Sequence, residues 1–121
     1  PYIWGGKSPF GIDEAGFVQM VYKIMGIPIP RDIFSQYEAI EKSIPTLDDA
    51  EVGDLIFFNN NMGQIIHVGI LIQTGYIIHA YGKVRVDRII PKGIYDVDAQ
   101  EITHTICAIK RILDDDEKKI T

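Results

Sequence analysis

A glycine-rich loop that runs directly into an apolar helix constrains this chain more than any other stretch. Loop and helix occupy residues 5–25 and read GGKSPFGIDEAGFVQMVYKIM. Val18 and Tyr22 add apolar surface on a second face, so we expect a helix that is buried on most sides. The helix itself is predicted because apolar residues recur at i, i+3, i+4, i+7 and i+8, namely Phe17, Met20, Val21, Ile24 and Met25.

The two ends of this helix carry residues that commonly cap one. Asp13 stands at the N-cap position, where a carboxylate accepts backbone N–H groups of the first turn. Gly26 stands where a helix ends in a left-handed residue. A helix N-terminus carries a partial positive charge and unpaired donors, which makes the first turn a favourable place for chemistry. The residue in that turn is Glu14.

After this helix the pattern changes to short β-branched segments. Residues 32–41 are a second helix candidate, and residues 47–53 are acidic and turn-like. A buried helix followed by antiparallel strands predicts an α+β fold, with the helix packed on a curled sheet of about five strands. We expect one domain at residues 1–113 and a charged tail at 114–121. The predicted strands are residues 54–58, 68–73, 76–80, 83–88 and 103–113.

Composition excludes several classes of function. The 121 residues carry a net charge of −5, which argues against a nucleic-acid partner because such proteins need basic patches. No apolar run is long enough for a membrane span. The single cysteine, Cys107, excludes an internal disulfide, and its apolar surroundings, TICAI, predict a small core residue. Because the chain begins with Pro1 rather than Met, we expect a piece of a longer protein.

Four stretches together resemble the NlpC-type cell-wall cysteine peptidases, which have a papain-like fold. The resemblance implies a bacterial hydrolase of the cell envelope or secreted fraction that cleaves a D-glutamyl–diamino acid bond in cell-wall peptides without a cofactor. It also implies a further helix upstream, which this chain lacks, and SH3-like domains upstream in many relatives. The four stretches are PYIWGGKSPFGID at 1–13, GF at 16–17 with PRD at 30–32, GDLIFF at 53–58, and HVGI at 67–70 with IHA at 78–80.

The resemblance also assigns catalytic positions. The family's general-base histidine opens the His-Val-Gly strand, which corresponds to His67, and the residue that orients this base corresponds to His79. The strands support this pairing, because the segments that carry both histidines flank a Thr74-Gly75 turn and would meet as a hairpin. The resemblance implies that three further residues contact the substrate, namely Asp13, Ala15 and Trp4, with Asp13 on the substrate's free amine. It also implies that Tyr2 lies near the oxyanion.

The sequence departs from the family at the nucleophile. The family's motif is Asp-Cys-Ser-Gly-Phe, whereas residues 13–17 read Asp-Glu-Ala-Gly-Phe. Glu14 thus replaces the cysteine and Ala15 the serine. A carboxylate serves as a nucleophile in glycosidases and phosphotransferases but is a poor one against an amide. We therefore expect a catalytically inactive domain whose cleft still binds cell-wall peptides.

Two other functions remain open from sequence. The chain could be a purely structural or interaction domain. Alternatively, Glu14, His67 and His79 have the composition of a facial-triad site for a divalent metal. Glu14 could also pair with a protonated His67, which would raise the pKa of that histidine. His104 belongs to no motif and is expected at the surface or at the rim of the site.

Overall fold

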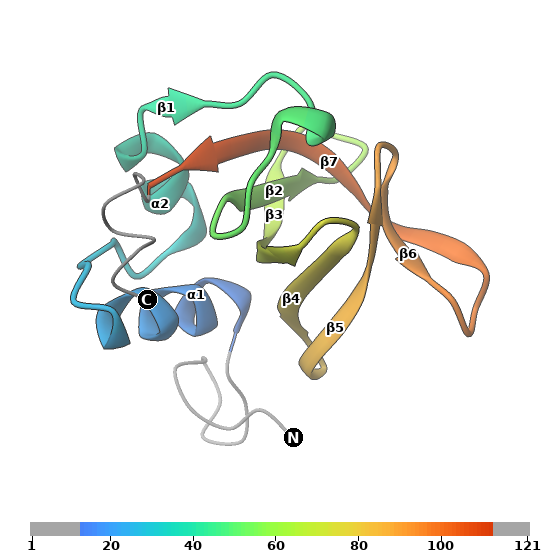
Figure 1. The fold of residues 1–121 in the computed structure, drawn as a ribbon, viewed down its shortest axis with the longest axis horizontal. Coiled ribbons are helices and arrows are strands. Elements are labelled where there is room, and N and C mark those ends of the chain that lie inside the picture. Colours follow the sequence, from blue (N-terminus) through green and yellow to red (C-terminus); the bar gives the residue numbers. More distant parts are fainter. Residues whose placement is uncertain (1–12, 113–121) are drawn as a thin grey trace.

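The computed structural model describes residues 13–112, in which two helices lie beside a strongly curved antiparallel sheet (Figure 1). Helix α1 spans Glu14–Ile24 and begins at Asp13, whose Oδ1 accepts the Gly16 N–H at 2.6 Å. Gly26 follows α1 with φ of 80°, as predicted for a helix end. The predicted cap and stop of this helix are both confirmed.

The buried face of α1 is narrower than the sequence indicated. Val18 and Tyr22 are fully buried against β3 and β4, and the Tyr22 hydroxyl donates to the Gly53 carbonyl. Ile24, by contrast, is 78% exposed. The prediction of a helix packed on most sides was therefore wrong at its last turn, because α1 packs mainly on β3 and β4 and this packing leaves Ile24 in solvent.

The second helix and the acidic turn also form. Helix α2 spans Ile33–Ala39 and is capped by Asp32, which accepts the Ser35 N–H at 2.9 Å. The turn-like stretch contains a short 3-10 helix, η1, at Leu47–Asp49. Neither α-helix is long and apolar enough to cross a membrane, within residues 13–112.

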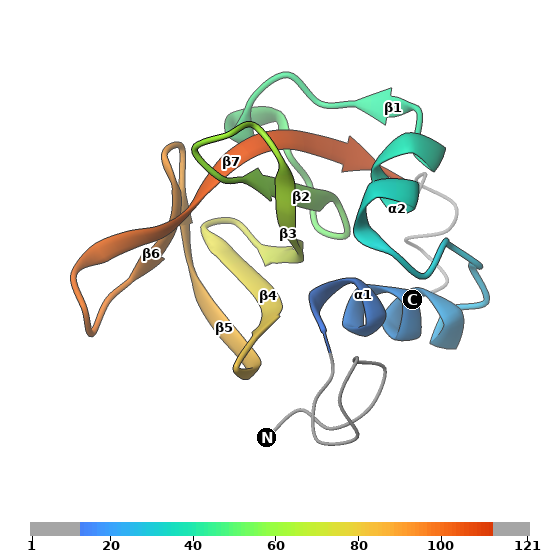
Figure 2. The same ribbon diagram turned by 180° about the vertical axis from the view of Figure 1, so that it is seen from behind.

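Seven strands form one antiparallel sheet in the order β1-β7-β2-β3-β4-β5-β6, and β6 also pairs with β7 (Figure 2). This last pairing closes six strands into a barrel, and β1 extends the end of β7. The predicted number of about five strands was wrong because β1 and β6 have two and four residues, too few to show a period. The strands are β1 Lys42–Ser43, β2 Leu55–Asn59, β3 Ile65–Gln73, β4 Tyr76–Tyr81, β5 Lys83–Ile90, β6 Gly93–Asp96 and β7 Glu101–Arg111.

Strand β2 separates two apolar cores. Leu55 and Phe57 face the helices, whereas Ile56 and Phe58 face the barrel interior. Burial on both faces explains why this strand reads as a continuous apolar run rather than an alternation. Its neighbour β3 alternates between the same two layers, so a residue's place in the sequence decides whether it meets α1 or the barrel interior.

Several sequence predictions lie outside the described residues. These are Tyr2 and Trp4, the glycine loop before Asp13, and the charged tail at 114–121. Their predicted roles stay predictions.

Candidate functional site

A hydrogen-bonded pair of histidines lies on the β3–β4 hairpin. His67 on β3 and His79 on β4 are both buried, and His67 Nε2 lies 2.8 Å from His79 Nδ1. The Thr74-Gly75 turn joins the two strands, as predicted. Strand register then places His79 opposite Gly69, two residues after His67 on the same face. The predicted meeting of the two histidines across a hairpin is confirmed.

Gly69 leaves the space that this pair requires. A Cβ at position 69 would lie 2.6 Å from Ile77 Cδ1 and 3.0 Å from His79 Cβ. Any larger residue would push His79 away from β3. The glycine in the His-Val-Gly motif therefore has a packing reason here, because it lets His79 approach His67.

The chain of hydrogen bonds continues beyond the histidines. His79 Nε2 lies 2.7 Å from Asp87 Oδ2 on β5. Arg85 donates to both oxygens of Asp87, at 2.7 and 2.9 Å, and lies 3.8 Å from Asp96 on β6. These two carboxylates belong to none of the sequence motifs and were not predicted as site residues. The β4–β5 turn at Gly82 could have revealed Asp87, since it sets Arg85 opposite His79 and Asp87 on the same face.

His104 on β7 is the third histidine of the site. Its ring stacks on that of His67 with centroids 4.1 Å apart and planes at 26°, while Tyr81 meets it edge-on at 4.7 Å. The side chain is buried, with 9% of its surface exposed, and Thr103 Oγ1 lies 2.8 Å from Nδ1. The expectation of a surface or rim position was therefore wrong. No local pattern could have found it, because the β6–β7 pairing that closes the barrel brings it there.

Burial keeps these imidazoles neutral. Desolvation, with the neighbouring His104 and His79, lowers the pKa of His67 to about 2. Desolvation likewise lowers the pKa of His104 to about 4. The pKa of His79 is also lowered by burial, against the opposing effect of its hydrogen bond to Asp87. The expectation that Glu14 raises the pKa of His67 is contradicted, because no contribution from Glu14 offsets this desolvation.

Glu14 is the first residue of α1, at the end of the helix that points toward β4 in both views (Figures 1 and 2). Its side chain is partly buried, and desolvation raises the pKa of its carboxyl, with a smaller raising contribution from Asp13. Within residues 13–112, no hydrogen bond or ion pair joins Glu14 to His67. Its assignment to the nucleophile position stays a prediction.

Asp13 has a well-defined structural role. Besides capping α1, it forms a two-point ion pair with Arg31, with contacts of 2.9 and 3.0 Å. Both carboxylate oxygens are therefore engaged. Its predicted contact with a substrate amine stays a prediction, as does that of Ala15, which is buried within α1.

The described residues do not support the metal hypothesis. Among residues 13–112, no group of three His, Cys, Asp or Glu side chains is arranged to hold a metal ion. The imidazole nitrogens that face each other in the His67–His79 pair are already bonded to one another.

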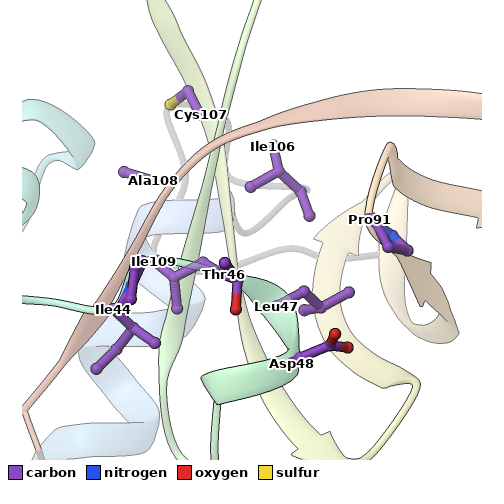
Figure 3. Close-up of a pocket in the computed structure, with 10 residues that line it drawn as sticks. Ile44, Thr46, Leu47, Asp48, Pro91, Ile106, Cys107, Ala108 and Ile109 are labelled. Carbon is purple, nitrogen blue, oxygen red and sulfur yellow. The ribbon is translucent and has the colours of Figure 1, made fainter.

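A cavity of about 390 Å³ lies elsewhere, between η1 and β7 (Figure 3). Cys107 lines this cavity and is exposed, whereas the sequence predicted a core residue. That prediction was wrong because β7 carries an irregularity opposite Phe57 and Phe58, which turns Cys107 out of the apolar alternation. The other lining residues are Ile44, Pro45, Thr46, Leu47, Asp48, Pro91, Ile106, Ala108 and Ile109.

The fold has close structural relatives. The NlpC/p60 domain of the peptidoglycan hydrolase SagA aligns with a TM-score of 0.65 and 30% identity, covering 93% of this chain and 86% of that one. RipD from Mycobacterium tuberculosis is described as a non-catalytic NlpC/p60 domain protein adapted to peptidoglycan binding. It aligns with a TM-score of 0.66 and 23% identity, covering 93% of this chain and 78% of that one, and so shares the fold.

Sequence comparison agrees with these folds. The gamma-D-glutamyl-L-lysine dipeptidyl-peptidase of Bacillus subtilis is 37% identical over 118 residues, covering 92% of this chain and 36% of that protein. The chain spans only about a third of such relatives, 36% in this case and 27% in the Bacillus cereus enzyme of the same name. The model of the NlpC/P60 family matches residues 1–103. As its motifs predicted, the chain belongs to the NlpC/P60 family of peptidases and peptidoglycan hydrolases.

Proposed function

We propose that this domain binds bacterial cell-wall peptides that contain a D-glutamyl–diamino acid link, and that it does not hydrolyse them. One observation carries the proposal. The His67–His79 pair is assembled at 2.8 Å, while Glu14 occupies the first residue of α1, where the family's motif has its cysteine. On this proposal the site keeps the two histidines of the barrel and lacks the cysteine thiol.

The chemistry of the remaining groups supports the absence of hydrolysis. A thiol peptidase needs a thiolate, which a helix N-terminus and an adjacent imidazole both stabilise. Glu14 supplies a carboxyl with a raised pKa instead, and a carboxylate is a poor nucleophile against an amide. Cys107 cannot substitute for the missing thiol. It lies exposed on β7, and desolvation of its sulfur raises the pKa.

The relatives support the ligand class. The Bacillus subtilis relative is named for a gamma-D-glutamyl-L-lysine bond, and SagA is a peptidoglycan hydrolase. RipD is described as a peptidoglycan-binding, non-catalytic protein, which supports the idea that this fold can bind without cleaving. By the same reasoning we propose that the protein acts in the cell envelope or outside the cell.

The test combines binding and turnover in one sample. Isotope-labelled protein is titrated with the tripeptide L-Ala-γ-D-Glu-L-Lys and followed by NMR, and the same sample is then analysed chromatographically for products. We expect saturable shifts at the histidine-bearing strands and no product. The control ligand is the epimer with L-glutamate, which should bind more weakly.

Two results would overturn the proposal. Product that accumulates in proportion to protein concentration would make the chain an active peptidase. Spectra that do not change with peptide would leave a structural or interaction domain as the better description.

A further inference from the structure

The histidine pair is one part of a longer chain of contacts that crosses four strands of the barrel. From β3 to β6 it runs through His67, His79, Asp87, Arg85 and Asp96, and every link except the last is a hydrogen bond of 2.7–2.9 Å. Asp87 is the junction, because its Oδ2 faces both the Nε2 of His79 and the Nε of Arg85.

The hydrogen-bond partners of Asp87 show that it is ionised and that the shared protons lie on its neighbours. Arg85, which cannot act as an acceptor, donates to both of its oxygens. These bonds, with that to His79, outweigh burial and lower the pKa of Asp87, so it is a carboxylate at neutral pH. A carboxylate only accepts hydrogen bonds. The Nε2 of His79 must therefore carry a proton and donate a hydrogen bond to Asp87.

This constraint passes to the next histidine. A neutral His79 with its proton on Nε2 has only a lone pair on Nδ1. The 2.8 Å contact then requires His67 to donate from Nε2. Because His67 is also neutral, its Nδ1 is left without a proton. No residue among 13–112 forms a hydrogen bond with that nitrogen.

We propose that Asp87, held in place by Arg85, is a positioning residue that sets the hydrogen-bond polarity of His67 through His79. Asp87 makes the Nδ1 of His67 an acceptor. A ligand can then meet it with an ammonium, an amide N–H or a hydroxyl, but not with a carbonyl or a carboxylate. Asp87 itself need not contact the ligand.

Two features of the structure make this arrangement rigid. The stacked ring of His104 and the edge of Tyr81 restrict rotation of the His67 ring. A ring flip therefore cannot exchange the positions of Nδ1 and Nε2, and the tautomer alone decides which nitrogen accepts. Gly93 allows β6 to approach β7 at this point, since a Cβ there would lie 1.7 Å from the His104 carbonyl oxygen. The close approach of β6 to β7 thus helps to keep His104 stacked on His67.

A cavity of about 390 Å³ reaches the outer end of the chain of contacts, where Arg85, Asp87 and Asp96 form part of its lining. Only 10% of the Asp87 side chain is exposed. The cavity gives the ionised end of the chain some solvent while His79 remains fully buried. The charge is therefore placed near water and its effect is carried inward by hydrogen bonds.

The first test reads the tautomers directly in the unmodified protein. Nitrogen NMR of labelled histidines distinguishes protonated from unprotonated ring nitrogens. At neutral pH and without ligand, we expect a proton on Nε2 and none on Nδ1 for both His67 and His79. A protonated Nδ1 on His67 would overturn the proposal. Because no peptide is present, this result is independent of whether the domain binds cell-wall peptides.

The second test removes the acceptor. In Asp87→Ala, no carboxylate oxygen remains to accept from the Nε2 of His79, so nothing fixes the proton on that nitrogen and both histidines should show a mixture of their two tautomers. Asp96→Asn is the matched control. It removes one carboxylate from Arg85 but leaves Asp87 intact, and should keep the original pattern. Dispersed spectra confirm that each variant is folded.

The outcome of the second test distinguishes whether Asp87 sets the tautomers of the histidines or only stabilises the fold. A folded Asp87→Ala protein with the original tautomers would contradict the proposal, because it would reduce Asp87 to a structural ion pair. If Asp87→Ala does not fold, the spectrum of the unmodified protein still decides the question.

Discussion

The barrel wall and the first turn of α1 supply the two halves of the candidate site, and they are built differently. The wall is a chain of buried side chains whose contacts follow from strand register, from His67 to Asp87. The first turn of α1 is held by Asp13, which caps it and pairs with Arg31. Position 14 has no comparable partner among the described residues, beyond electrostatic effects from Asp13 and Arg31.

This difference explains why the two halves tolerate change unequally. Removing one member of a buried hydrogen-bonded chain leaves its partner unsatisfied, which costs about 1–3 kcal/mol. Replacing a residue in the first turn of a capped helix costs little, and an acidic side chain there contributes about 0.3–1 kcal/mol of stability. The fold therefore constrains the histidines more than position 14, and Glu14 is compatible with an intact wall.

Restoring the nucleophile gives the largest expected effect and tests whether the wall is still competent. If the proposed function is right, Glu14→Cys combined with Ala15→Ser should introduce hydrolysis of L-Ala-γ-D-Glu-L-Lys, measured chromatographically, where the unmodified protein gives no product. Adding His67→Ala should lower that rate by about 10²–10⁴-fold, the usual contribution of a general base. A restored protein whose rate is unaffected by His67→Ala would show that the wall plays no part.

The next largest effect concerns the stability of the barrel rather than the site. Asp54 is fully buried and accepts two hydrogen bonds from Arg111, at 2.8 and 2.9 Å. Breaking such a buried pair by removing one partner costs about 3–5 kcal/mol. Asp54→Ala should therefore lower the free energy of unfolding by this amount in urea denaturation. Asp48→Ala, an exposed acid on η1, is the control and should change it by less than about 0.5 kcal/mol.

Acidification should weaken the wall through its histidines. The pKa of His67 falls to about 2 and that of His104 to about 4 in the folded protein, against about 6.5 when unfolded. Below pH 6.5 the unfolded state binds more protons, so stability decreases as pH falls. Each histidine contributes up to about 1.4 kcal/mol per pH unit above its folded pKa.

Urea denaturation between pH 7 and pH 4.5 measures this loss. His104→Phe keeps the stacked ring but removes one titration, so its slope should be shallower. Glu14 opposes the trend, because its raised pKa favours the folded state at lower pH. Stability that rises on acidification through this range would contradict the assignment of neutral, buried histidines.

The smallest expected effect is at the helix end. Asp13→Ala removes the α1 cap and the carboxylate of the partly exposed ion pair with Arg31. A lost N-cap costs about 1 kcal/mol, and a partly exposed ion pair adds little. The free energy of unfolding should fall by about 1–2 kcal/mol. A loss as large as that of Asp54→Ala would mean that the first turn of α1 depends on its contacts as strongly as the barrel does.

Much of the helix and hairpin structure was predictable because local chemistry determines it. Capping residues marked both ends of α1, and the Thr74-Gly75 turn set the hairpin that joins His67 to His79. All five predicted strands exist, and their ends either match the prediction or differ from it by up to three residues. These features depend on residues close together in sequence.

Features that depend on barrel closure were not predictable. His104 reaches His67 only because β6 pairs with β7, and β6 is too short to show a period. The irregularity in β7 that exposes Cys107 has no marker in its apolar alternation. Ile24 fits the predicted apolar stripe of α1 and is nevertheless exposed, since the extent of the sheet decides how much of the helix is covered.

The most direct test of the account is a competition between two thiols in one protein. In the variant Glu14→Cys with Ala15→Ser, an alkylating reagent meets the introduced thiol and Cys107 together, and mass spectrometry of peptides gives both rates. The helix N-terminus and the histidine wall should lower the pKa of the introduced thiol, whereas the pKa of Cys107 is raised by desolvation. We expect position 14 to react faster, and His67→Ala to remove that advantage. An introduced thiol that reacts no faster than Cys107 in a folded protein would contradict the claim that the histidine wall can still activate a nucleophile at position 14.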